Sequence, residues 1–98
     1  MKTRNEPRTE IGRLLEKERA NLGLSMGAFA EVLGTTRPTY QNWRMRPVNI
    51  EPDNVDAIAE ILGMTDVEVY AILRRDPESA HNPRSVWFAR PIDAAVAA

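Results

Sequence analysis

Apolar side chains recur every three or four residues in five short blocks of the chain, which is the spacing of one face of an α-helix. Block by block, the apolar positions are Ile11, Leu14, Leu15 and Leu22; Phe29, Ala30, Val32 and Leu33; Tyr40 and Trp43; Val55, Ile58, Ala59 and Leu62; and Val69, Tyr70, Ile72 and Leu73. The pattern therefore predicts five short amphipathic helices and an all-α fold.

Glycines and hydroxyl residues mark the expected ends of these helices. Gly23, Gly34 and Gly63 each follow an apolar block, and glycine suits the left-handed conformation that often ends a helix. Thr65 and Glu68 match a capping box that opens the last helix, which we expect to end at about residue 75. The connections between the helices are then only a few residues long.

Prolines mark three expected helix starts, because the first turn of a helix does not use the N–H group that proline lacks. These residues are Pro7, Pro38 and Pro52. Ser25 and Thr36 are suitable N-caps for the second and third helices. We expect the third helix to span residues 36–45.

The sequence predicts one domain of five helices over residues 7–76. A polar N-terminal arm, residues 1–6, precedes this domain, and a C-terminal tail, residues 77–98, follows it. The tail contains three prolines and shows no helical stripe until its end, but it carries the bulky residues Trp87 and Phe88 side by side. We interpret the tail as a possible dimerisation or partner-binding segment.

The composition is that of a compact globular protein and excludes several other classes. Of 98 residues, 43% are hydrophobic and 28% are charged. The chain has no cysteine, which excludes a disulfide framework and a thiolate zinc site. Neither a membrane-length apolar run nor a signal-peptide core is present, so we expect a cytoplasmic protein that does not contact membranes.

Enzymatic and metal chemistry is not indicated by the sequence. His81 is the only histidine, and neither a serine–histidine pairing nor a glycine-rich phosphate loop is visible. The acidic residues are scattered over the expected helix surfaces, where we interpret them as solvated charges. We therefore expect no enzymatic activity, no cofactor and no metal site.

The net charge of −1 is unevenly distributed between the two halves of the chain. Residues 1–50 carry nine lysines and arginines against five acidic residues, a balance of +4. Residues 51–98 carry four arginines against nine acidic residues, a balance of −5. The first half would attract a polyanion, although chance unevenness is an alternative explanation.

The positive half contains the segment LGLSMGAFAEVLGTTRPTYQNWRMR, residues 22–46. It places a glycine-containing turn between two short amphipathic helices, and the second of them is rich in polar residues and arginines. We expect Tyr40 and Trp43, which lie three residues apart, to anchor that helix to the core. Its opposite face is then free, which is how a helix–turn–helix protein presents a recognition helix to the major groove of DNA.

This segment resembles the phage-repressor-like (Cro/repressor, XRE-type) helix-turn-helix family. The motif AFAEVLGTTRPTYQNWR and the later IAEILGMTDVEVY carry the resemblance, which covers about residues 10–74. The matching positions are Ala30, Leu33, Gly34, Thr36, Tyr40 and Trp43. The resemblance implies a five-helix, lambda-repressor-like domain that binds double-stranded DNA.

Three residues depart from the family pattern. Met26 stands where many relatives have a glutamine whose amide can contact the DNA backbone. Pro38 removes a polar group from the recognition helix, and Arg44 replaces an acidic residue that often follows the tryptophan. These departures concern the details of specificity and leave the docking mode unchanged.

The exposed face of the third helix supplies the residues that we expect to contact bases. An arginine can bond guanine in a bidentate manner, and glutamine or asparagine can do the same to adenine. The expected base-contacting residues are Thr36, Arg37, Pro38, Gln41 and Asn42. The alternative is that these residues are ordinary solvated surface.

Phosphate contacts carry most of the affinity in such complexes. The candidates are Thr35, Thr39, Arg44 and Arg46, with Arg13, Lys17 or Arg19 from the first helix. Arg4 and Arg8 are candidates for an arm that enters the minor groove, although the arm is as readily interpreted as disordered.

A single recognition helix contacts only a few base pairs, so we expect a homodimer that places two helices about 34–36 Å apart. The residues expected at the dimer or partner surface are Val69, Ile72, Trp87 and Phe88. Trp87 and Phe88 could instead fold back onto their own domain.

The sequence thus predicts a sequence-specific DNA-binding regulator, a repressor of phage or mobile-element type. The alternative is an antitoxin or other interaction module whose tail binds a partner protein, with or without DNA binding.

Overall fold

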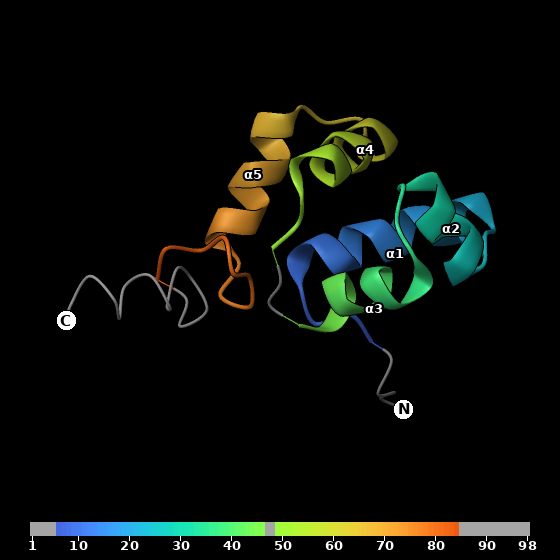
Figure 1. Ribbon diagram of the computed structural model, residues 1–98, viewed down its shortest axis with the longest axis horizontal. Coiled ribbons are helices and arrows are strands. Elements are labelled where there is room, and N and C mark those ends of the chain that lie inside the picture. The colour runs from blue at the N-terminus through green and yellow to red at the C-terminus, as the bar shows by residue number, and fades with distance from the viewer. Residues whose placement is uncertain (1–5, 47–48, 85–98) are drawn as a thin grey trace.

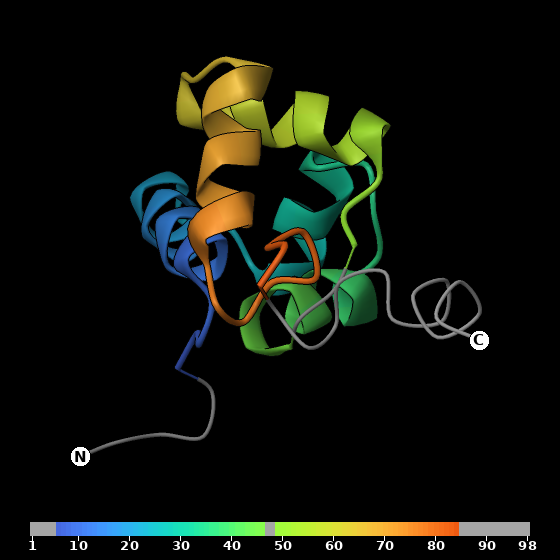
Figure 2. The same cartoon turned by 90° about the vertical axis from the view of Figure 1, so that its left-hand side faces the viewer.

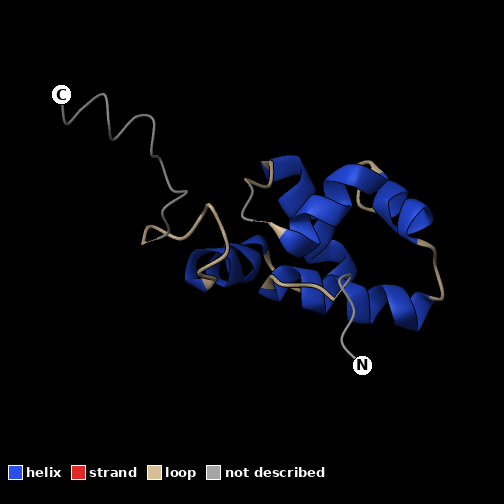
Figure 3. Cartoon of the chain, turned by 90° about the horizontal axis from the view of Figure 1, so that it is seen from below, coloured by secondary structure: helices blue, strands red, loops and turns tan. Residues whose placement is uncertain are grey.

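The computed structural model describes residues 6–46 and 49–84, and the regular structure in these ranges is entirely α-helical (Figures 1 and 3). The helices are α1 (Glu10–Leu22), α2 (Met26–Val32), α3 (Arg37–Met45), α4 (Pro52–Leu62) and α5 (Asp66–Arg75). The prediction of five helices and an all-α fold is confirmed. None of the described helices is long and apolar enough to cross a membrane.

Most helix ends form as the sequence predicts. Ser25 caps α2, and its Oγ accepts a hydrogen bond from the Ala28 N–H at 3.1 Å. Both bonds of the capping box between Thr65 and Glu68 are present at the start of α5. These bonds satisfy backbone groups that a helix terminus would otherwise leave without partners.

The start of α1 differs from the prediction. Pro7 lies before the helix instead of in its first turn, and Thr9 is the N-cap. The Thr9 Oγ1 accepts a hydrogen bond from the Gly12 N–H at 3.0 Å and donates one to the carbonyl oxygen of Trp43 at 2.5 Å. One buried hydroxyl therefore both caps α1 and joins it to α3.

The hydrophobic core is built around α1, which packs against α3, α4 and α5 (Figure 1). Helix α2 packs on α3, and α4 packs on α5. The core consists of buried side chains from all five helices and the α3–α4 connection, namely Ile11, Leu15, Phe29, Ala30, Leu33, Tyr40, Trp43, Ile50, Val55, Ile58, Ala59, Val69, Ile72 and Leu73.

Two of these core residues correct a prediction. Val69 is fully buried and Ile72 is only 5% exposed, so the prediction that they form a dimer surface is wrong. Helix α5 contacts both α1 and α4, and these contacts use its apolar stripe within its own chain. The other two residues predicted for that surface, Trp87 and Phe88, lie outside the described residues.

The α2–α3 turn is fixed by backbone hydrogen bonds and by one side chain from α4. Gly34 has a φ of +74°, as the sequence predicts for this position, and its N–H donates to the Glu31 carbonyl oxygen at 3.0 Å. The Thr35 N–H donates to the Ala30 carbonyl oxygen at 2.9 Å. The amide of Asn54 donates to the carbonyl oxygen of Leu33 at 3.2 Å. The turn thus holds α3 at a defined angle to α2.

The residues after α5 fold back onto the domain (Figure 2). Asp76 is 5% exposed, and its Oδ2 accepts a hydrogen bond from the Glu10 N–H at 2.7 Å, at the start of α1. Ser79 is also buried. The His81 Nε2 accepts a hydrogen bond from the Ile50 N–H at 3.0 Å, which ties this segment to the α3–α4 connection. Part of the predicted tail is therefore packed against the helices.

Gly12 lies where the backbone of α1 comes close to that of α3. A Cβ atom at this position would lie 2.7 Å from Thr9 Oγ1 and 2.8 Å from the Arg44 Cα. Because neither neighbour is the free end of a flexible side chain, an added methyl group must push the two helices apart. Glycine is thus required here for packing, and the sequence pattern did not indicate this.

We predict that Gly12→Ala lowers the free energy of unfolding by about 1–3 kcal/mol, the usual cost of overpacking a tight site. Gly27→Ala is the matched control, because nothing lies within 4 Å of a Cβ at that helical position. The control is expected to be neutral or stabilising by up to about 1 kcal/mol. Urea denaturation measures both, and equal effects of the two changes would contradict this account.

We also predict that the protein loses stability as the pH falls below about 6.5, because of His81. Burial lowers the pKa of His81 from its ordinary value of 6.5, and the charge of Arg74 adds to this effect. The unfolded chain therefore takes up a proton at a higher pH than the folded protein. The stabilisation is fully present above the unfolded pKa and decreases as the pH falls toward the folded pKa.

Urea midpoints at about pH 7.5 and pH 5.5 measure this dependence. His81→Gln is the informative variant, because its amide oxygen can still accept a bond from the Ile50 N–H but does not titrate. In this variant, the urea midpoint should fall much less between about pH 7.5 and pH 5.5 than it does in the unchanged protein. If the midpoint falls equally in both proteins, another titrating group causes the loss of stability.

Candidate nucleic-acid interface

Helix α3 has one face buried in the core and one face at the surface. Tyr40 and Trp43 are 0% and 2% exposed, so the prediction that they anchor this helix is confirmed. The Tyr40 ring packs edge-on against Phe29 of α2, with centroids 5.5 Å apart, and against Trp43, with centroids 6.4 Å apart. Aromatic pairs in this geometry add to the stabilisation from burial alone.

The predicted base-contacting residues lie at the surface of α3. Thr36, Arg37 and Pro38 are exposed, and Gln41 and Asn42 are partly buried. Thr36 is the N-cap, as predicted, and its Oγ1 accepts a hydrogen bond from the Thr39 N–H at 3.3 Å. A surface hollow between α2 and α3 is lined by Met26, Arg37, Pro38 and Gln41. The first two turns of α3 are therefore open to a ligand.

The predicted phosphate-contacting residues are only partly available. Arg13, Lys17 and Arg46 are exposed, and Thr35 and Thr39 are partly buried. Arg19 instead forms hydrogen bonds within the protein. Its guanidinium donates to both carboxylate oxygens of Glu16, at 2.8 and 2.9 Å, and to the Leu24 carbonyl oxygen at 2.8 Å.

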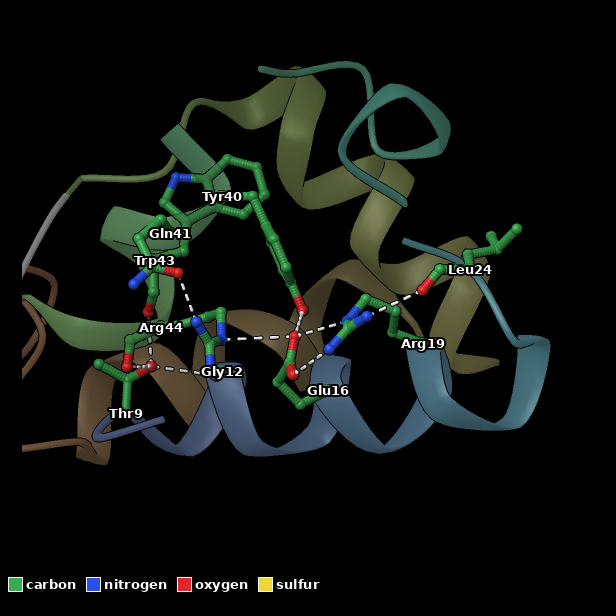
Figure 4. A network of polar contacts seen from close by, with 9 residues as sticks. All are labelled: Thr9, Gly12, Glu16, Arg19, Leu24, Tyr40, Gln41, Trp43 and Arg44. Atoms are coloured by element: carbon green, nitrogen blue, oxygen red, sulfur yellow. Dashed lines mark hydrogen bonds and ion pairs between the residues drawn. The ribbon is translucent and has the colours of Figure 1, made fainter. Parts of the chain in front are cut away.

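Arg44 corrects the prediction for its position. Its side chain is 2% exposed, so the expectation that it contacts phosphate is wrong. The Nε lies 3.3 Å from the Glu16 Oε2, and the Nη1 donates a hydrogen bond to the Gln41 Oε1. The guanidinium therefore lies between α1 and the surface of α3 (Figure 4).

Glu16 is the acceptor at the centre of this network (Figure 4). It receives the Arg19 guanidinium, the Arg44 ion pair and a hydrogen bond from the Tyr40 hydroxyl at 2.5 Å. The interpretation of the acidic residues as solvated charges is wrong for Glu16. The ion pair between Glu16 and Arg44 joins α1 to α3, which gives the basic residue after Trp43 a role within the protein.

The surroundings of Glu16 and Tyr40 keep Glu16 ionised and the Tyr40 hydroxyl protonated. Burial alone would raise the pKa of Glu16, but the bonds from Arg19 and Tyr40 and the charge of Arg44 outweigh it and lower the pKa. Burial and the bond to Glu16 raise the pKa of Tyr40 well above its usual range. Near neutral pH, Glu16 is therefore a carboxylate and Tyr40 a phenol that donates to it.

The N-terminal segment also reaches α3. The N–H groups of Arg8 and Thr9 both donate to the Arg44 carbonyl oxygen, at 2.7 and 3.1 Å. The Arg8 side chain is exposed, so its predicted role in an arm stays a prediction. Arg4, the other arginine of that arm, lies outside the described residues. Within the described ranges, no group of three metal-ligating side chains comes together.

We predict that Glu16→Met destabilises the protein more than Arg44→Met. Removal of Glu16 takes the shared acceptor from Arg19, Tyr40 and Arg44 at once, and breaking a buried ion pair costs about 3–5 kcal/mol. Removal of Arg44 leaves Glu16 with Arg19 and Tyr40 as partners, so its cost is smaller. Urea denaturation of both variants tests the order, and equal costs would contradict the central place of Glu16 in the network.

The chain matches the family model described as helix-turn-helix over residues 15–69, more than half of its 98 residues. The match includes α2, the turn and α3 in full. No curated protein and no solved structure matches the chain significantly. With the five-helix fold and the exposed polar face of α3, this match shows that the chain belongs to the phage-repressor-like (Cro/repressor, XRE-type) helix-turn-helix family of DNA-binding regulators.

Proposed function

We propose that this protein is a sequence-specific transcriptional repressor that inserts α3 into the major groove of double-stranded DNA. The observation that carries the proposal is the division of α3 into two faces. Tyr40 and Trp43 fix the inner face in the core, whereas Thr36, Arg37 and Pro38 are exposed on the outer face. A helix held in this way can enter a groove without rearrangement of the domain.

The chemistry of the outer face fits direct recognition of bases. Arg37 can donate two bonds to guanine, and Thr36, Gln41 and Asn42 add short polar groups that can reach base edges. Pro38 offers an apolar surface to a thymine methyl group. Together these residues form a small polar site that can distinguish a few base pairs.

The affinity would come largely from the phosphate backbone. With Arg44 buried, the remaining candidates for phosphate contacts are Arg13, Lys17, Thr35, Thr39 and Arg46. The excess of basic residues in the first half of the chain supports this proposal, because it attracts the polyanion to the half that carries α3.

We further propose that the protein binds as a homodimer to a site with two-fold symmetry. One α3 contacts too few base pairs for a specific site, and two copies would meet successive turns of one groove about 34–36 Å apart. Since Val69 and Ile72 belong to the core, the apolar stripe of α5 is not the dimer surface.

The regulated target is proposed to be a promoter of a phage or mobile element, which the bound protein would cover. It would act in the cytoplasm, where such DNA is accessible. The alternative of an antitoxin rests on Trp87 and Phe88, which lie outside the described residues. Co-purification with a small basic protein would favour that alternative.

We predict that purified protein enriches a short duplex from a random pool, and that Arg37→Ala combined with Gln41→Ala abolishes this preference. Weak binding should persist and fall as salt rises from about 50 to 200 mM, because the phosphate contacts remain. Gel-shift titration of the enriched duplex and of a scrambled duplex measures both the sequence preference and the weak, salt-dependent binding.

Arg74→Ala is the matched control, because it also removes one positive charge but lies on α5 at an exposed position away from α3. The control should retain the preference for the enriched duplex. Full discrimination by the double variant would show that α3 is not the recognition helix. An enriched site without two-fold symmetry would contradict the proposed dimer.

A further inference from the structure

The side chain of Gln41 is held in one orientation by Arg44, from within the protein. The Arg44 Nη1 donates a hydrogen bond to the Gln41 Oε1. A guanidinium has only donors, so the atom of the amide that faces it must be the oxygen. The amide nitrogen then lies on the side away from Arg44, as Figure 4 shows.

Arg44 is itself fixed by contacts that reach back to α1. Its side chain is 2% exposed, and the Glu16 carboxylate that pairs with it at 3.3 Å is also bound by Arg19 and Tyr40. A bond from a buried cation to an amide oxygen is stronger than one between neutral groups. The orientation of Gln41 is therefore set before any ligand arrives.

Within the described part of the chain, no neighbour at the surface competes for the amide nitrogen of Gln41. Met26 lines the same hollow as Gln41, but its thioether is only a weak acceptor. Among the described residues, none accepts a hydrogen bond from the Gln41 Nε2. The nitrogen is thus the polar atom of Gln41 that remains available to a ligand in the hollow.

We propose that Gln41 meets DNA as a hydrogen-bond donor and selects guanine over adenine, and that Arg44 is the positioning residue for this choice. The inference rests on the proposed function, since it assumes that α3 lies in the major groove. Bidentate recognition of adenine needs the amide oxygen to accept from N6 while the nitrogen donates to N7. Here the oxygen faces Arg44 inside the protein, so the amide presents its nitrogen, and not its oxygen, to a ligand in the hollow.

The edge of guanine suits the arrangement better. It offers two acceptors, O6 and N7, to the donor nitrogen of Gln41, whereas adenine places its N6 donor where guanine has O6. The positive charge of Arg44 behind the amide also favours the electronegative edge of guanine. Residue type alone suggested an adenine contact for Gln41, and the contact with Arg44 reverses that expectation.

The experiment is selection of bound duplexes from a random pool by the full chain and its variants. Gln41→Ala first identifies the base pair that Gln41 contacts, as the position whose preference it abolishes. At that position the unchanged protein should enrich guanine over adenine. Arg44→Met frees the amide oxygen, and the ratio of guanine to adenine should fall by about fivefold or more, the lower end of what one good base contact contributes.

A second variant keeps the test valid if Arg44→Met fails to fold. Gln41→Glu keeps an oxygen acceptor for Arg44 but replaces the donor nitrogen with a second acceptor, so it should lose the preference for guanine. Glu60→Gln, at an exposed position on α4, is the control that should leave the whole profile unchanged. Circular dichroism of each variant confirms that it is folded.

The outcomes separate this inference from the proposed function. Adenine preferred by the unchanged protein, or a profile that Arg44→Met leaves unaltered in the folded variant, would overturn the role of Arg44. A guanine preference that persists in Gln41→Glu would also overturn it. Enrichment of no sequence at all by the unchanged protein would overturn the proposed function, and this inference with it.

Discussion

The Glu16 carboxylate is the interaction on which the position of α3 depends. It is a half-buried charge, and such a group is stable in a protein only when enough donors surround it. Tyr40 and Arg44 of α3 and Arg19 of its own helix supply those donors. Because two of the three come from α3, satisfying this one charge fixes the rotation of α3 against α1 as well as its distance.

The contacts at the N-terminal end of α1 allow α1 and α3 to come this close. Gly12 has no Cβ, and the Thr9 hydroxyl bonds the Trp43 carbonyl oxygen, so the backbones meet without an intervening side chain. The apolar anchors Tyr40 and Trp43 fill the space between the helices. The result is a short helix whose inner face is fully committed to the domain, which leaves the outer face free for recognition.

The same network links the interior of the protein to its surface. A buried ion pair often contributes little to stability compared with apolar residues of the same size. The Glu16–Arg44 pair has a second consequence, because Arg44 also donates a hydrogen bond to the Gln41 amide at the surface of α3. In this domain, the choice of charges inside the core therefore affects the hydrogen-bonding groups that the proposed recognition helix presents.

The sequence by itself determined the five helices, most of their caps and the inward face of α3, because helix periodicity and capping depend on residues at most four positions apart. Ser25, Thr36, Gly34 and the Thr65–Glu68 box illustrate this. Only the tertiary structure decided the surroundings of Gly12, Glu16, Arg44 and Val69. Their partners lie on other helices, and whether a charge is solvated or an apolar residue is covered depends on which helices meet. An acidic residue and an arginine 28 positions apart carry no local signal of pairing.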